Sequence, residues 1–473
     1  MNRRIVFIAV MLLVIASMGI VLFILNNEQE IPRETSSAAP AIEEYIYNTE
    51  NYELNFITVL NSHGEYTLTV GDDIVIKGHE DLPLDIFNIF HILDVSGKLG
   101  SRGVITEEAD NYSIFGLDPP QAQVYIQPQN GEAVSLFIGS SAPDGGVYVK
   151  LGGSMQVNLA SYSDVRLFLS GFLELIDTSI TPSVRKNQSG AFIFEKIILG
   201  GRVREEISIT NSAPVNDVFA HIASPYQIII PVNIPVSIEK TSVIESLFGL
   251  KAGRAAAVLS DDVITRREEL NRYGLSQPWS TAEAAGSGAD FRILVSKPDG
   301  AGKVNILREG TTLIYEAAAS NLPWLEVSYF ELMDRMVFIP FIDNVASVEI
   351  KTPERSITFS LSTEGGALSV NAGSVDIDVG NFRAFYQTLV GTRYDEYSDI
   401  SAISLPPPFL EIIYNYRSRG ISTDIVSFHQ ASSRRVLTSL NHSRPFFTHS
   451  VYTDKILSDL DLVLAGRRVR AYL

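Results

Sequence analysis

The sequence predicts an α+β protein with an N-terminal transmembrane helix and three tandem repeats of mainly antiparallel strands flanked by helices. Three observations predict this class. An apolar run stands near the N-terminus, apolar and polar residues alternate along much of the remaining chain, and a short corner of glycine, leucine and proline returns as FGLDPP, YGLSQP and SLPPP. Short connections rich in turn residues favour antiparallel pairing over parallel crossovers.

The composition excludes several classes of protein. The chain has 473 residues, of which 45% are hydrophobic and 19% charged, a balance typical of folded chains with several domains. Lys and Arg total 37 against 55 Asp and Glu, and the formal charge of −18 argues against a nucleic-acid partner. Because there is no cysteine, disulfides, thiolate metal sites, a cysteine nucleophile and a lipidated cysteine are all excluded.

Residues 5–25 are predicted to form the transmembrane helix. Ser17 is the polar member of this run, and as a helix the run is about 31 Å long, which matches the apolar core of a bilayer. Arg3 and Arg4 lie in the preceding tail, residues 1–4, so the positive-inside rule places that tail in the cytoplasm. We therefore expect a single-pass membrane protein with the bulk of its chain extracytoplasmic.

A cleavable signal peptide is the alternative to this anchor. Ser37, Ala38 and Ala39 offer small residues for cleavage. The apolar run is longer than the usual roughly 7 to 15 residues, however, and Pro40 would follow the cut, so the sequence favours the anchor. The polar residues 26–47 are predicted to form a flexible stalk.

Residues 48–178 form the first predicted repeat. Apolar and polar side chains alternate along residues 66–70, which predicts a strand facing a core on one side. A helix is expected at residues 84–97, then the corner at residues 115–120, then four short strands. A second helix at residues 161–177 closes the repeat.

Residues 190–335 form the second predicted repeat and residues 344–473 a divergent third. The phrases LELID and FELMD are separated by the same number of residues as Gly116 and Gly274, to within one residue. Helices are expected in these repeats near residues 243–250, 327–335 and 382–390, and at the end in YTDKILSDLDLVL.

The corners are expected to have a structural role. Glycine takes a positive φ at the end of a helix, proline stops the helix, and leucine packs beneath the turn. The second corner has Gln277 where the first has Pro119, and the third has Ser404 in place of glycine. The predicted structural residues are Gly116, Leu117, Pro120, Gly274, Leu275, Pro278, Leu405 and Pro406.

The first repeat resembles a known bacterial family. The phrases YSIFGLDPPQAQVYI and LFIGSSAPDGGVYVKLGGSMQVNLAS are similar to the domain of unknown function 4340 family, and the resemblance covers most of residues 50–335. That family has no assigned activity. The resemblance implies a single-pass envelope protein, and some members are encoded beside ABC-transporter components of the gliding-motility auxiliary type. It implies a transport-associated accessory role and carries over no catalytic residue.

The sequence shows no constellation that identifies a reaction. HExxH, GxSxG, P-loop and GxGxxG patterns are absent from it. His429, His442 and His449 lie close enough in sequence to converge on a metal, although ordinary imidazoles are the better interpretation. We therefore predict no catalytic, metal or cofactor-binding residue, and no cofactor.

One feature of the third repeat suggests a docking surface. Residues 401–473 carry nine basic and five acidic residues inside a strongly acidic chain. Such asymmetry marks either a docking patch for an acidic partner or a solvated face that balances acidic neighbours, and the second is the simpler interpretation. The candidate patch consists of Arg417, Arg419, Arg434, Arg435 and Arg444.

The sequence thus predicts a non-enzymatic, membrane-anchored envelope protein. Its expected partners are the membrane and a membrane-protein complex such as ABC transporter subunits, the latter by family analogy. The alternatives are a module that binds an extracellular polymer or wall glycan in grooves between repeats, and a hydrolase with an unrecognised site.

Overall fold

A computed structural model describes most of the chain after the predicted stalk. The described residues are 44–49, 53–187, 190–211, 224–286, 290–364, 367–400, 404–417 and 423–470. The predicted transmembrane helix at residues 5–25 lies outside them, as does nearly all of the stalk. Among the described helices, none combines the length and the apolar character needed to cross a bilayer.

Contacts divide the described chain into two compact units. One contains the described residues up to Asp72 together with His91–Leu169, and the other contains Asp73–Phe90 and the residues from Ser170 onward. Four antiparallel sheets with a few helices make up these units, so the α+β class and the mainly antiparallel pairing are confirmed.

The first unit contains a small sheet and a large one. In the small sheet β1 (Tyr45–Asn48) pairs with β5 (Lys98–Gly100). The strands of the large sheet in this unit follow the order β3-β2-β7-β8-β9-β10-β6. Their bounds are β2 Leu54–Asn61, β3 Gly64–Val70, β6 Gly103–Thr106, β7 Ala122–Pro128, β8 Val134–Ser141, β9 Gly146–Leu151 and β10 Val157–Ser161. Helix α2 (Ile86–Gly97) begins in the second unit and ends in the first, and β4 (Ile74–Ile76) belongs to the second.

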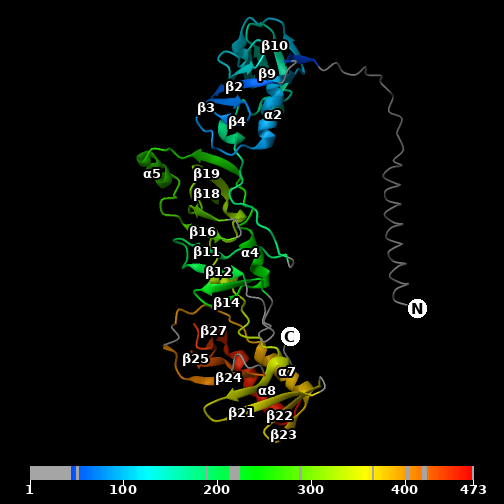
Figure 1. Ribbon diagram of the computed structural model, residues 1–473, viewed down its shortest axis with the longest axis vertical. Coiled ribbons are helices and arrows are strands. Elements are labelled where there is room, and N and C mark those ends of the chain that lie inside the picture. Colours follow the sequence, from blue (N-terminus) through cyan, green and yellow to red (C-terminus); the bar gives the residue numbers. More distant parts are fainter. Residues whose placement is uncertain are drawn as a thin grey trace, which may run out of the picture. The chain divides into compact units, whose positions relative to one another are not determined.

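The middle sheet, in the second unit, has nine strands in the order β14-β13-β12-β11-β16-β17-β18-β19-β15. Helices α4 (Thr241–Glu245) and α5 (Val263–Arg272) accompany it (Figure 1). The short helix α6 (Tyr329–Leu332) follows its last strand in the sequence. The strand bounds are β11 Lys196–Gly200, β12 Ile207–Asn211, β13 Tyr226–Ile230, β14 Ile234–Pro235, β15 Arg254–Val258, β16 Ser280–Ala285, β17 Phe291–Val295, β18 Lys303–Arg308 and β19 Leu313–Ala318.

The C-terminal sheet has eight strands in the order β23-β22-β21-β20-β24-β25-β26-β27. Helices α7 (Val379–Val390) and α8 (Ser450–Leu464) lie side by side against it (Figure 1). The buried ring of Phe359 on β21 lies 5.2 and 5.7 Å from those of Phe382 and Phe385 on α7. The strand bounds are β20 Val345–Lys351, β21 Ser356–Glu364, β22 Ala367–Ala372, β23 Val375–Ile377, β24 Pro408–Tyr416, β25 Thr423–Gln430, β26 Arg435–Leu440 and β27 Phe446–His449.

The three large sheets share a central pairing, and a corner precedes one of its strands each time. Each central pair joins the first strands of two meanders: β2 with β7, β11 with β16, and β20 with β24. FGLDPP ends just before β7, YGLSQP just before β16, and SLPPP runs into the start of β24. The corners therefore lead the chain into the middle of each sheet.

The first two corners have the geometry that their glycines predict. Gly116 has φ 65° and Gly274 has φ 70°, and each ends a helical turn. Their amides donate to Ser113 O and Asn271 O, both at 3.0 Å. The leucines that follow, Leu117 and Leu275, are buried.

The third corner differs, since Ser404 cannot supply the same turn at low cost. Leu405 is half-buried and Pro406 is exposed. The carbonyl of Pro406 accepts a hydrogen bond from Nδ1 of the buried His429. A side chain on a neighbouring strand thus fixes a corner that lacks glycine.

Several helices are shorter than predicted. The expected helix at residues 161–177 is wrong: α3 (Tyr162–Val165) and a separate 3-10 turn (Phe172–Leu175) stand in its place, and Gly171 between them is extended. The helices expected near residues 243–250 and 327–335 shrink to α4 and α6. Apolar periodicity did not predict α5, because this helix is mainly polar. It begins directly after its N-cap residue, Asp262.

Replacement of Gly274 by alanine should destabilise the middle sheet by about 1–2 kcal/mol, because φ is positive and the new Cβ would lie 3.3 Å from Ser296 Cβ. Gly300→Ala is the control, since that position is open and free of the positive-φ strain. Both tryptophans, Trp279 and Trp324, lie in or beside this sheet, so urea unfolding followed by their fluorescence measures the difference. Equal effects of the two substitutions would contradict the corner's structural role.

A charged cluster ties together three strands of the middle sheet. Glu316 on β19 accepts from Arg254 on β15 at 3.0 Å and from Lys303 on β18 at 2.7 Å. These hydrogen bonds lower the pKa of Glu316 from 4.5 to about 2. Since the folded carboxyl is the stronger acid, its stabilising contribution is complete above 4.5 and is lost as the pH falls toward 2.

Glu316→Gln should flatten the pH dependence of stability in that acidic window. The urea midpoint of the unchanged chain should fall between about pH 5 and about pH 3, while that of the variant falls less. Glu268→Gln on α5 is the control, because Glu268 is exposed and has no ion pair with the described residues. If the two variants follow the same pH profile, the cluster does not contribute in this way.

Candidate functional site

Two short segments of the second unit make matching backbone contacts on both sides, and they position the candidate site. We call residues 176–180 the first joint segment and residues 333–337 the second. Ile176 forms a bridge with Leu84, and Met333 forms the corresponding bridge with Val236. The amides of Asp85 and Ser237 donate to the carbonyls just before each segment, both at 2.8 Å.

The far side of each joint segment pairs with residues that follow a helical segment. Ser179 forms a bridge with Lys251, and Met336 forms one with Arg393. In the second joint segment, the amide of Val337 donates to Thr392 O at 3.0 Å, and the amide of Tyr394 donates to Arg335 O at 2.7 Å. Each joint segment thus acts as a short strand held from two directions.

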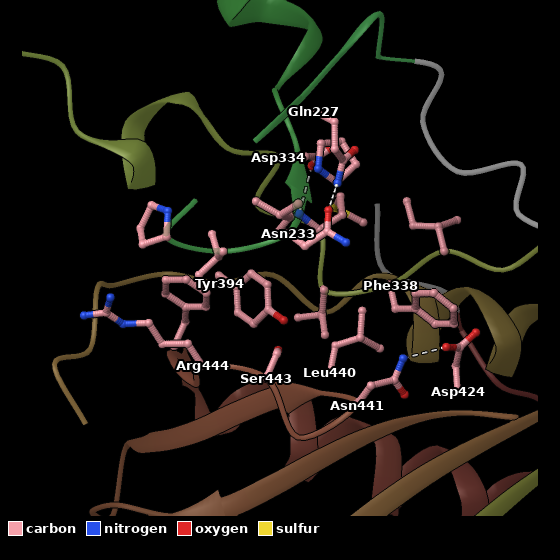
Figure 2. A pocket seen from close by; sticks show the side chains of 18 residues that line it. Gln227, Asn233, Asp334, Phe338, Tyr394, Asp424, Leu440, Asn441, Ser443 and Arg444 are labelled. Atoms are coloured by element: carbon pink, nitrogen blue, oxygen red, sulfur yellow. Dashed lines mark hydrogen bonds between the residues drawn. The ribbon is translucent and has the colours of Figure 1, made fainter. Parts of the chain in front are cut away.

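A groove of about 490 Å³ lies beside the second joint segment (Figure 2). Asp334, Met336 and Val337 of that segment form part of its lining. The β13–β14 hairpin forms one wall and the connection from β26 to β27 forms another. Its volume falls within the range of small-molecule and peptide sites.

The hairpin wall is built from the sequence PVNIP. Pro231 and Pro235 restrict its backbone, and they leave Asn233 at the tip. Gln227 Nε2 donates to Asn233 Oδ1 at 2.9 Å, which Figure 2 shows beside Asp334. Two amide side chains are therefore held toward the groove.

The opposite wall contains a turn in an uncommon conformation. Asn441 and His442 have φ 50° and 58°, the left-handed region that most side chains avoid. Asn441 Nδ2 donates to Asp424 Oδ1 at 2.6 Å, and the hydroxyl of Tyr416 donates to Oδ2 of the same carboxylate at 2.7 Å. The side-chain oxygen of Asn441 accepts from the amide of Ile425 at 2.9 Å. These bonds hold the turn against the sheet.

Burial changes the pKa of two groups that line the groove, the Asp334 carboxyl and the Tyr394 phenol. Burial raises the pKa of Asp334, opposed by the amide of Met336 and by the charge of Arg393. Burial also raises the pKa of the Tyr394 phenol, which remains neutral over the physiological range. The groove thus presents a half-buried carboxyl and a phenol beside amides.

Arg444 supplies a cation at the edge of the groove, and aromatic rings hold it. Its guanidinium lies 5.0 Å from the ring centroid of Tyr397 and 5.7 Å from that of Tyr329. It donates to the hydroxyl of Tyr397 and lies 3.8 Å from a carboxylate oxygen of Glu205. An arginine with these contacts is a fixed feature of the surface.

The lining of the groove combines polar groups with an apolar floor. No hydroxyl in the lining is hydrogen-bonded to a histidine or a carboxylate that would activate it as a nucleophile. Across the described ranges, no three His, Asp or Glu side chains group as metal ligands do. Amide, carboxyl, phenol and guanidinium groups around an apolar floor are suited to recognising a polar chain.

The four arginines of the predicted patch that the structure describes lie at two ends of the C-terminal meander. Arg434 lies in the turn between β25 and β26 and Arg435 begins β26, whereas Arg417 and Arg444 lie at the other end of that meander. The length of β25, about 27 Å, separates the two ends. Arg419 lies outside the described residues.

Two of these arginines already have acidic partners. Arg435 lies 2.7 Å from a carboxylate oxygen of Glu396, and Arg444 faces Glu205. Neutralisation by these neighbours favours the solvated-face interpretation for Arg435. The patch as a docking surface stays a prediction.

Apart from Arg444, which the predicted docking patch included, sequence reasoning did not foresee the groove residues. Their prolines and asparagines are typical turn formers, and no spacing rule connects PVNIP to a turn more than two hundred residues later. The prolines of PVNIP, and Asn441 with His442, each indicate only a turn in the sequence. The structure shows that these two turns form the facing walls of one groove.

The described chain is built of antiparallel sheets with a few helices, and one groove lies beside its second joint segment. Residues 75–210 match the model of the family described as Domain of unknown function (DUF4340), and this confirms the predicted resemblance. The match is shorter than the region 50–335 over which the resemblance was drawn. Neither the search of curated proteins nor the search of solved structures found a significant match.

Proposed function

We propose that this protein is a non-enzymatic, membrane-anchored scaffold of the bacterial envelope that serves an ABC-type transport system. The apolar run at residues 5–25 supports the anchor, and the family resemblance supports the transport association. The ectodomain lies on the extracytoplasmic side in this proposal, because Arg3 and Arg4 precede the anchor.

The three large sheets are, in this proposal, copies of one unit. Their central pairs are connected alike, each corner precedes the same central strand, and the two joint segments make matching contacts. Repeated units expose similar surfaces at regular intervals along a chain. Such an arrangement suits a scaffold that contacts a large partner at several places.

The groove beside the second joint segment is the observation that carries the docking role. Its walls have fixed backbones, its polar side chains are pre-positioned, and Arg444 is held at its edge. Pre-positioned groups reduce the entropy lost on binding, so a groove of this kind suits a peptide segment of a partner.

A bulky residue in the groove should weaken partner recovery. Ser443 is exposed and lines the groove, so Ser443→Trp fills it without removing a described side-chain hydrogen bond. We expect full-length protein extracted in mild detergent to co-purify with transporter subunits, and the variant to recover several-fold less, as measured by quantitative mass spectrometry.

Ser433→Trp is the matched control, because Ser433 is exposed in the turn at the far end of the same meander. Undiminished recovery with Ser443→Trp would exclude the groove as the docking site. Absence of transporter subunits from the unchanged protein at native expression would overturn the scaffold role itself.

Glycan binding is a second candidate function, and the groove lining is what favours it. Asn233, Gln227 and Asn441 present amides of the kind that bind sugar hydroxyls. Retention of the purified ectodomain on wall polysaccharide, lost in Ser443→Trp, would support this function over protein docking.

A further inference from the structure

The second corner lines a cleft whose charge is opposite to that of the whole chain. The cleft measures about 580 Å³ and is open to solvent. Arg202, Arg272 and Lys297 contribute to its lining, and no described carboxylate does so. In a chain of formal charge −18, three cations around one cleft are a local exception.

Aromatic rings hold two of these cations in place. Lys297 Nζ lies 5.3 Å from the ring centroid of Trp279, and the Arg272 guanidinium lies 5.0 Å from that of Tyr273. Contact with a ring face does not consume the N–H donors of a cation. None of the three cations has an ion pair with a described residue, so these donors stay available to an external anion.

Backbone contacts hold the turn that carries the third cation, Arg202, beside Trp279. The amide of Val203 donates to Trp279 O at 3.0 Å. Gly201 has φ 103°, and a Cβ there would lie 2.5 Å from the same carbonyl, so this approach requires glycine. Arg204 then anchors the turn, with guanidinium bonds to the carbonyls of Trp324 and Val327 at 2.7 and 2.8 Å.

One carboxylate lies at the edge of this arrangement. Trp279 Nε1 donates to Glu326 at 2.8 Å, and this bond orients the indole. Even with Glu326 included, the charges named around the cleft sum to a positive value. The cleft therefore favours an anion.

We infer that this cleft binds an acidic oligosaccharide, with Arg202, Arg272 and Lys297 on its carboxylates and the exposed amides of Asn271 and Gln277 on its hydroxyls. The inference is independent of the docking role of the groove. Open clefts with mixed amide and cation donors suit a sugar chain, which carries many hydroxyls and about one carboxylate per uronic-acid ring.

The overall charge selects this ligand over denser polyanions. A chain of −18 repels nucleic acid and anionic lipid surfaces, whose phosphates are closely spaced. A short uronic-acid chain carries fewer charges, so the protein as a whole repels it less and the cations of the cleft can attract it. The first corner gives a contrast, since the pocket at Pro120 is lined by uncharged residues.

Oligogalacturonate provides the test, with its fully methyl-esterified form as the neutral probe. The chain has two tryptophans and Trp324 is fully buried, so ligand quenching reports Trp279. Titration of the full-length protein in detergent should show binding of the acidic probe. The double substitution Arg272→Gln with Lys297→Gln should weaken it about tenfold, the sum of two modest ion contacts.

Arg267→Gln is the matched control, because Arg267 is an exposed arginine of the same helix outside the cleft. The affinity of Arg267→Gln for the acidic probe should equal that of the unchanged protein. The charge-conserving double substitution Arg272→Lys with Lys297→Arg should also keep binding, unlike the double glutamine variant. An unchanged urea midpoint checks that each variant is folded.

The inference would be overturned by no binding of the acidic probe, by equal binding of its methyl ester, or by equal affinity in the double glutamine variant. Binding to anionic lipid vesicles without binding to oligogalacturonate would also overturn it, in favour of a lipid headgroup. The groove substitution Ser443→Trp should leave oligogalacturonate affinity unchanged, so failure of the docking role and failure of this inference are distinguishable.

Discussion

The backbone hydrogen bonds of the joint segments are the constraint on which the second unit depends. A segment between two sheets carries amides and carbonyls that must be satisfied, and an extended segment cannot satisfy them internally. Residues 333–337 meet this need by pairing with Val236 on one side and with Arg393 on the other. The same pairing places Asp334 and Val337 beside the β13–β14 hairpin, so the groove follows from how the backbone is satisfied.

The sequence predicted the parts of the fold that depend on local chemistry. Gly116 and Gly274 adopt the positive φ expected of them, and the leucines after them are buried. Helix lengths were overestimated where apolar spacing continued past a break, as at Gly171, because periodicity does not detect an extended residue within an apolar stretch. Helix α5 was missed for the opposite reason: it has a good cap and few buried apolar residues.

The candidate sites could not be read from the sequence because they depend on distant contacts. Net charge located a basic C-terminal region, yet there Arg435 and Arg444 face glutamates. The three cations of the cleft, which have no ion pair with a described residue, lie instead in separate segments of the chain. They meet because the β11–β12 turn approaches Trp279. Pairing between a cation and its partner is a property of three-dimensional position, which a count of charges does not contain.

The two-sided joint segments also bear on how the chain responds to force. Hydrogen bonds between antiparallel segments lie perpendicular to the strands, so tension along a joint segment loads several of them together in shear. Bonds loaded together resist extension better than bonds that open one after another. Under such tension the second joint, whose residues 333–337 are paired on both sides, would lengthen less than an unpaired connection of the same length.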